Sequence, residues 1–189
     1  GTLIGPGEIA VKDTIIRSKH IIIATGSKPK QIPNLPFSDH VLSSDHIFNL
    51  QTPPKRLCVI GAGIVGIELA SVFQRVGSQV DVYEKLETMS LHGIEPSIVK
   101  PLLDALSESG VSFHFSAPQF EITNDRKGCK LTFEDGTTKH YDKILVAIGR
   151  KANVDFFDTK TCQLTLSDRG YIQVNDRFET NMDNVYAIG

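Results

Sequence analysis

A glycine-rich segment carries the most specific chemical pattern in the sequence. Gly61, Gly63 and Gly66 follow the apolar run 57–60 in G-x-G-x-x-G spacing. The first glycine allows a tight turn, the second leaves the backbone open to a pyrophosphate, and the third lets a helix lie close to a strand. Unpaired N–H groups and the positive end of the helix dipole would then attract phosphates. The spacing therefore predicts a site for a dinucleotide.

The residues around these glycines supply the strand, helix and acid that such a site requires. Apolar residues recur at helical spacing from Ile64 onwards, and a second apolar strand, Val80–Tyr83, ends at Glu84. Glu84 lies 18 residues after Gly66, where a carboxylate can accept hydrogen bonds from the adenine ribose. An acid there repels a 2′-phosphate and favours NAD over NADP, although Lys85 follows directly. The alternative is a glycine-rich turn in an ordinary α/β domain, with Glu84 on a solvated strand end.

Composition indicates a soluble globular protein and excludes several classes of partner. The 189 residues are 40% hydrophobic and 22% charged, with a net charge of −2 and scattered basic residues. These features favour neither nucleic acid nor a membrane as partner, and the longest apolar runs are too short to span a bilayer. Cys58, Cys129 and Cys162 show neither disulfide nor metal-ligand spacing, and we expect no metal site. A reducing compartment fits: the cytoplasm, or an organelle matrix or stroma if a transit peptide was removed.

The remaining segments predict an α/β fold with an antiparallel insertion. A helix is expected before Gly110; it either begins near Pro101 or is kinked there, while Pro96 suits a first helical position. Residues 29–54 are expected to be irregular, with a short helix around Ser44 to Phe48. Further strands are expected at 14–16, 21–24, 111–115, 120–122, 130–133, 138–141, 144–148, 169–174 and near the end of 180–189, with turns at 125–128 and 135–136.

Four segments together resemble a known family. They are IIIATGSKP (21–29), GAGIVGIE (61–68), ILVAIGRKAN (144–153) and TNMDNVYAIG (180–189). This set resembles the flavoprotein disulfide reductases that carry two dinucleotide folds. The resemblance implies an α/β, Rossmann-like parallel sheet with helices and an antiparallel β-meander crossover. It also implies an NAD-binding domain at 48–155, flanked by partial FAD-domain strands at 1–47 and 156–189.

The resemblance also implies roles for individual residues. Ile64 matches a position near the nicotinamide, and Glu68 an acid near nicotinamide and flavin; without the family, Glu68 would be an exposed helix acid. Gln119 matches a position near the adenine where relatives often carry an apolar residue. The NAD-binding residues implied are Gly61, Ala62, Gly63, Ile64, Val65, Gly66, Ile67, Glu68, Glu84, Gln119 and Gly149. Those implied on the FAD side are Thr25, Gly26 and Ser27.

The family's redox chemistry is expected to lie outside these residues. Its FAD fingerprint, its Cys-x-x-x-x-Cys pair and its acid–base histidine are absent, so we expect no catalytic residue in this segment. Because the chain begins with Gly1, we expect it to be a fragment. The fingerprint is most similar to the branch that oxidises dihydrolipoyl groups and passes electrons through FAD to NAD, as a homodimer within a lipoyl-carrying dehydrogenase complex. An NADH oxidase, a mercuric reductase, a transhydrogenase or a nucleotide-binding module without chemistry remain alternatives.

Overall fold

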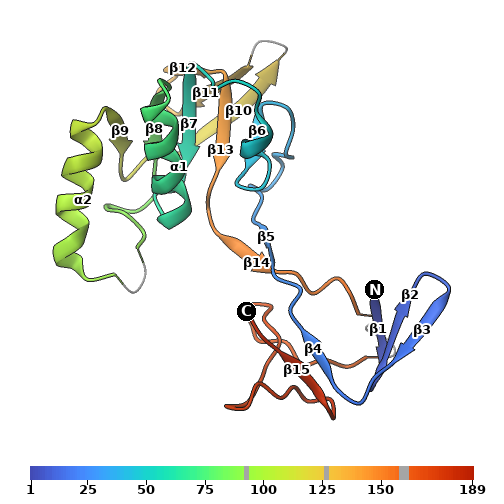
Figure 1. Ribbon diagram of the computed structural model, residues 1–189. Helices are drawn as coiled ribbons and strands as arrows, with labels where there is room; N and C mark the ends of the chain where they lie inside the picture. Colours follow the sequence, from blue (N-terminus) through green and yellow to red (C-terminus); the bar gives the residue numbers. More distant parts are fainter. Residues whose placement is uncertain (92–93, 126–127, 158–161) are drawn as a thin grey trace. The chain divides into compact units, whose positions relative to one another are not determined.

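The chain forms two compact units, each with its own hydrophobic core. The computed structural model describes residues 1–91, 94–125, 128–157 and 162–189. One unit consists of residues 29–149, and the other combines residues 1–28 with residues 150–189 (Figure 1). The glycine-rich segment and Glu84 belong to the first unit, which is therefore the frame of the candidate site.

A parallel sheet forms the centre of the first unit. Its strand order is β6-β13-β7-β8-β9, and every neighbouring pair runs parallel. The strands are β6 (Val41–Ser43), β13 (Lys143–Val146), β7 (Arg56–Ile60), β8 (Gln79–Tyr83) and β9 (Val111–His114). Side chains alternate between the faces of β7: Leu57 and Val59 belong to one core cluster, Cys58 and Ile60 to another. Both faces of the sheet are covered, as continuous apolar strands require.

Two helices cover the first face. α1 (Ile64–Arg75) directly follows the glycine-rich turn, and it packs Ile67 and Phe73 into the cluster that contains Leu57 and Val59. α2 (Pro96–Glu108) also packs against this cluster through Leu102, Leu103 and Leu106. This apolar face stabilises a three-layer arrangement of helices, sheet and meander.

The structure resolves the question about Pro101. α2 begins at Pro96 and continues through Pro101 rather than starting there. Proline at a first helical position loses no backbone bond, but an internal proline removes the bond to the preceding turn and costs about 3 kcal/mol. The leucines that follow Pro101 are partly buried against the core cluster, and the apolar area that they remove from water, worth about 25 cal/mol per Å², acts against this cost.

An antiparallel meander covers the second face of the sheet. β10 (Phe120–Asp125), β11 (Gly128–Phe133) and β12 (Thr138–Tyr141) pair in sequence order. Leu131 and Tyr141 from the meander share a core cluster with Cys58 and Ile144 from the sheet. The three predicted strands are confirmed, and the first two are longer than expected. Residues 126–127 of the predicted turn lie outside the described residues.

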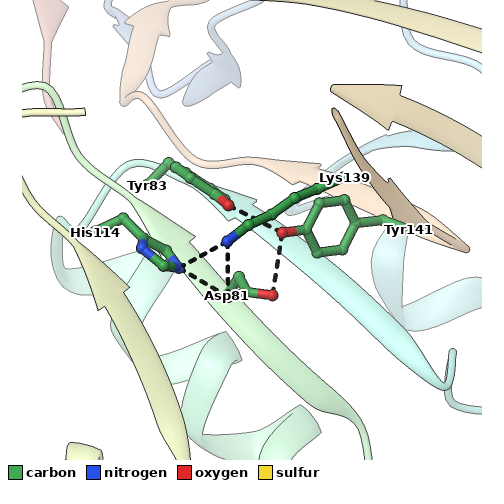
Figure 2. A network of polar contacts seen from close by, with 5 residues as sticks. All are labelled: Asp81, Tyr83, His114, Lys139 and Tyr141. Atoms are coloured by element: carbon green, nitrogen blue, oxygen red, sulfur yellow. Dashed lines mark hydrogen bonds and ion pairs between the residues drawn. The ribbon is translucent and has the colours of Figure 1, made fainter. Parts of the chain in front are cut away.

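A polar network joins the sheet to the meander (Figure 2). Asp81 Oδ1 lies 2.8 Å from His114 Nε2, and the Tyr141 hydroxyl donates to Asp81 Oδ2 at 3.0 Å. The hydroxyls of Tyr83 and Tyr141 are 3.0 Å apart, and Lys139 Nζ lies 3.9 Å from Asp81 Oδ1. Burial and the Tyr83 hydroxyl raise the pKa of Tyr141, so its hydroxyl stays protonated as a donor. Asp81 thus fixes the meander on β8 through several partners.

We expect Tyr141→Phe to destabilise the first unit by about 1–2 kcal/mol, because it removes the donor to Asp81 and the partner of Tyr83 while keeping the ring. Urea unfolding followed by circular dichroism measures the change. The matched control is Tyr171→Phe, whose side chain is 50% exposed and whose loss of a hydroxyl should leave stability unchanged. Equal stability of the two variants would show that the network contributes little.

The second unit contains three small groups of strands. β1 (Thr2–Gly5), β2 (Glu8–Val11) and β3 (Thr14–Arg17) form an antiparallel sheet. β4 (Ile21–Ile23) pairs in parallel with β15 (Val185–Ala187), and β5 (Ser27–Pro29) pairs with β14 (Arg150–Ala152). Leu3, Ile21, Cys162 and Val185 lie in its core. Segments from both ends of the chain therefore build one unit.

Three local expectations are corrected. Residues 29–54 are not wholly irregular, because β6 lies within them at the edge of the parallel sheet. The short helix is a 3-10 turn, η1 (Ile47–Asn49), which begins later than expected and buries Ile47. The segment 169–174 forms no strand; its one pairing is an isolated bridge between Leu166 and Ile172. Gly170, with φ +79, closes a turn there by donating its N–H to the Ser167 carbonyl at 2.8 Å.

Candidate dinucleotide-binding site

The glycine-rich turn connects the carboxyl end of β7 to the first turn of α1. Gly61 has φ +106, and a Cβ on it would lie 2.6 Å from the Ala147 carbonyl oxygen. A Cβ on Gly66 would overlap the Gly61 carbonyl oxygen. These approaches are too close for any side chain. The expected requirement for a tight turn and a close contact between helix and strand is confirmed.

Gly63 leaves open the space in front of the helix. It is the N-terminal capping residue of α1, its carbonyl accepts the Ile67 N–H at 3.0 Å, and no side chain caps the helix. The nearest atom to a Cβ on Gly63 would be the Ser90 carbonyl oxygen, at 3.7 Å. The first N–H groups of a helix have no partner within it, so they can donate to an anion. This end of α1 can therefore hold a pyrophosphate without moving the backbone.

Glu84 follows β8 and is bonded to the glycine-rich turn. Its side chain is only 8% exposed. Oε2 accepts the Ala62 N–H at 2.9 Å and the Ser90 hydroxyl at 2.8 Å, and Oε1 accepts the Leu86 N–H at 3.0 Å. Burial acts to raise the pKa of Glu84, but these donors outweigh it and lower the pKa. The alternative of Glu84 on a solvated strand end is wrong: an ionised carboxylate is held beside the turn.

The position of the turn within the sheet favours a ligand. β7 lies between β13 and β8. The next strands in sequence, β8 and β9, lie on one side of β7, whereas β13 and β6 lie on its other side. Ligands of open α/β sheets bind at the carboxyl ends of strands at such a switch point. Gly149, with φ +108, follows β13 at the same edge, since Val146 pairs with Ile60 at the end of β7. The sheet thus brings two sequence-predicted segments together.

The other predicted residues of this unit differ in exposure. Ile64 and Val65 are 49% and 37% exposed, so both can contact a ligand, whereas Ile67 is 6% exposed and packs in the core. Glu68 and Gln119 are exposed, and neither is among the hydrogen-bond partners of Glu84 described above. Their places beside nicotinamide and adenine stay predictions.

The residues predicted for the FAD side belong to the second unit. The Thr25 hydroxyl donates to the Asn153 carbonyl at 2.7 Å, and the Asn153 N–H donates to the Gly26 carbonyl at 2.9 Å. Arg150 Nε donates to the Ser27 hydroxyl at 2.7 Å. Gly26 has φ +69, which favours glycine. In this structure, Thr25 and Ser27 therefore bond to Asn153 and Arg150, and their approach to FAD stays a prediction.

Ser90 is the residue of the site that the sequence analysis missed. Its hydroxyl bonds to Glu84, and its N–H donates to the Ala62 carbonyl at 3.1 Å. It lies in an irregular segment without periodicity, so no spacing pointed to it. The one available signal was its position between Met89 and Leu91, which are 4% and 8% exposed and fix it in place.

The described parts of the chain show two further properties. Neither helix there is both long and apolar enough to cross a bilayer. Within the same ranges, no group of three His, Cys, Asp or Glu side chains is placed to hold a metal ion. All three cysteines are buried, as expected for Cys58.

Comparison with known proteins gives consistent matches over the whole chain. The model of the pyridine nucleotide-disulphide oxidoreductase family matches residues 1–189. A dihydrolipoyl dehydrogenase from Chlamydia pneumoniae is 34% identical over 193 residues, covering 100% of this chain and 41% of that protein. A soluble pyridine nucleotide transhydrogenase from Mycobacterium bovis is 34% identical over 196 residues, covering 100% and 42%. The structure of the HOCl-induced flavoprotein disulfide reductase RclA from Escherichia coli matches with a TM-score of 0.86 and 25% identity, over 100% of this chain and 43% of that one.

These matches confirm the family and the α/β fold expected from the four segments. The chain spans less than half the length of the relatives it matches. The names of the family and of its structural neighbours, pyridine nucleotide and flavoprotein, agree with the expected cofactors NAD and FAD. The chain therefore belongs to the pyridine nucleotide-disulphide oxidoreductase family.

Proposed function

We propose that this chain is the NAD(H)-binding part of a flavoprotein disulfide oxidoreductase, and that the whole protein is a dihydrolipoamide dehydrogenase. The observation that carries the nucleotide assignment is the buried, ionised Glu84 bonded to the Ala62 N–H beside an open helix end. The similarity to the Chlamydia dihydrolipoyl dehydrogenase supports the choice of member.

The residues of this chain bind and orient the nucleotide. The backbone of Gly63 and the first turn of α1 would hold the pyrophosphate, because no side chain caps this helix end and a Cβ on Gly63 would come no closer than 3.7 Å to another atom. Glu84 would accept a ribose hydroxyl, and Ile64 and Glu68 would lie near the nicotinamide. Gly149 would line the site, and Gln119 would lie near the adenine. Thr25, Gly26 and Ser27 would lie on the FAD side.

The proposed reaction moves two electrons from a dithiol to NAD. A bound FAD would supply the two-electron chemistry between the dithiol and the nicotinamide. The contribution of this chain is to place the nicotinamide and to exclude NADP. The proposed substrate is a dihydrolipoyl group carried by a dehydrogenase complex, and the proposed assembly of the whole protein is a homodimer.

A transhydrogenase is the second candidate, since a transhydrogenase is also 34% identical to the chain. An enzyme of that class must accept NADPH as well as NADH. Glu84 opposes this, because a carboxylate near the ribose repels a 2′-phosphate. Cofactor preference therefore separates the two candidates.

We expect NADH to bind at least about 10-fold more tightly than NADPH, because repulsion between charges near a protein surface amounts to about 1–4 kcal/mol. Isothermal titration calorimetry on the chain measures both dissociation constants. The whole protein should reduce NAD with dihydrolipoamide, and the chain alone should not. Tighter binding of NADPH would overturn the NAD assignment, and NADPH-to-NAD hydride transfer without dithiol turnover would favour the transhydrogenase.

A further inference from the structure

Ser90 is held rigidly beside the carboxylate of Glu84. The flanking side chains of Met89 and Leu91 are buried in the core that also contains Ala62. Burial on both sides fixes the backbone of this segment although it has no regular secondary structure. Ser90 is therefore presented to the glycine-rich turn by packing, and its position does not depend on a ligand.

Hydrogen bonds join Ser90, Ala62 and Glu84 in a closed ring. The Ser90 N–H donates to the Ala62 carbonyl at 3.1 Å, and the Ala62 N–H donates to Glu84 Oε2 at 2.9 Å. The Ser90 hydroxyl completes the ring by donating to the same Oε2 at 2.8 Å. Each of the three residues is thus bonded to the other two, which fixes the orientation of the carboxylate.

The two carboxylate oxygens of Glu84 differ in their hydrogen-bond donors. An ionised carboxylate offers about four acceptor positions. Ala62 and Ser90 occupy those of Oε2, and Leu86 occupies one on Oε1. Oε1 accepts from Leu86 alone among these three donors, so it is the oxygen better placed to accept a ribose hydroxyl; the Lys85 N–H also lowers the pKa of this carboxylate. The Ala62 and Leu86 donors are backbone groups set by the fold, whereas the Ser90 donor is a side chain and can be removed by substitution.

We propose that Ser90 is a positioning residue for cofactor choice: its hydroxyl holds Glu84 so that Oε1 meets the adenine ribose and the carboxylate cannot rotate away from a 2′-phosphate. The inference rests on the proposed nucleotide site. A carboxylate free to turn would still attract NADH weakly but would reject NADPH less. Ser90 acts through Glu84 and is not proposed to contact the reacting atoms.

The test compares Ser90→Ala with Ser90→Thr in the protein, using calorimetry with NADH and with NADPH. Ser90→Ala should weaken NADH binding by about 3- to 10-fold, less than the full effect of a hydrogen bond to a charged group because Ala62 and Leu86 still hold the carboxylate, and should leave NADPH binding unchanged or up to about 2-fold tighter. Ser90→Thr keeps the hydroxyl and should retain the wild-type ratio. Ser112→Ala, an exposed serine of β9, is the matched control and should change neither constant.

A second measurement separates this inference from the nucleotide assignment. Carbon-13 NMR of the Glu84 carboxyl should give a higher pKa in Ser90→Ala than in the wild type, because one donor to the ionised form is lost. If the wild type binds no NADH, the proposed function fails while the NMR titration still tests the Ser90–Glu84 bond. If NADH binds but Ser90→Ala leaves the affinity ratio and the pKa unchanged, the inference is overturned. Equal weakening of both cofactors also overturns it, since the choice between them would not depend on Ser90.

Discussion

Glu84→Arg is expected to make NADPH the tighter ligand. The variant removes the proposed acceptor for the ribose hydroxyl. Hydrogen bonds to charged groups contribute about 1.5–3 kcal/mol, so NADH binding should weaken by about 10- to 100-fold. Arginine can pair with a 2′-phosphate through two parallel hydrogen bonds, so NADPH should bind more tightly than in the wild type. Calorimetry with both cofactors measures the reversal.

Two variants control for other effects of the change. Glu87→Arg makes the same charge reversal at an exposed position of the same loop and should leave the preference for NADH intact. Glu84→Gln keeps the size of the side chain but removes its charge, so it should weaken NADH binding and relieve the repulsion of the 2′-phosphate, with a smaller gain in NADPH affinity than Glu84→Arg, which also adds a pairing cation. Thermal melting checks that each variant is folded, because Glu84 is buried and satisfies two backbone donors. An unchanged preference in folded Glu84→Arg would remove Glu84 from the ribose site.

The sequence predicted the elements whose requirements are local. Gly61 and Gly66 are needed because backbone atoms approach them, and that demand is visible as spacing after an apolar strand. The alternating and continuous apolar runs likewise located β7, β8, β9 and the three meander strands. The sequence also placed Glu84 at the end of β8, whereas its hydrogen bond to the Ala62 N–H of the turn is seen only in the structure.

The sequence could not predict features that depend on long-range packing. β6 is a three-residue strand in a proline-rich segment, and it forms because β13 offers it a parallel edge far away in the chain. The segment 169–174 has the composition of a strand but only an isolated bridge, between Leu166 and Ile172. The position of Ser90 beside Glu84 depends on the packing of Met89 and Leu91 in the core, which the sequence alone does not show. Local propensity decides little where the partner is distant in sequence.

Gly61→Ala is expected to destabilise the first unit by about 3 kcal/mol or more and to abolish NADH binding. Left-handed backbone costs a side chain about 1–2 kcal/mol, and overpacking in a well-packed region adds about 1–3 kcal/mol. The added methyl would lie 2.6 Å from the Ala147 carbonyl oxygen and 2.9 Å from its carbon, so β7 and the segment after β13 would have to separate. That separation would also displace the turn that we propose holds the pyrophosphate.

Gly77→Ala supplies the matched control for this prediction. Gly77 has φ +98, close to the φ +106 of Gly61, but a Cβ on it would meet no atom within 4 Å. It should therefore cost only the backbone term of about 1–2 kcal/mol and leave NADH binding unchanged. Urea unfolding and calorimetry on both variants isolate the contribution of the contact with Ala147. Equal destabilisation of the two would mean that the turn tolerates a side chain, and the close approach of the Ala147 carbonyl would then not be what requires glycine at this position.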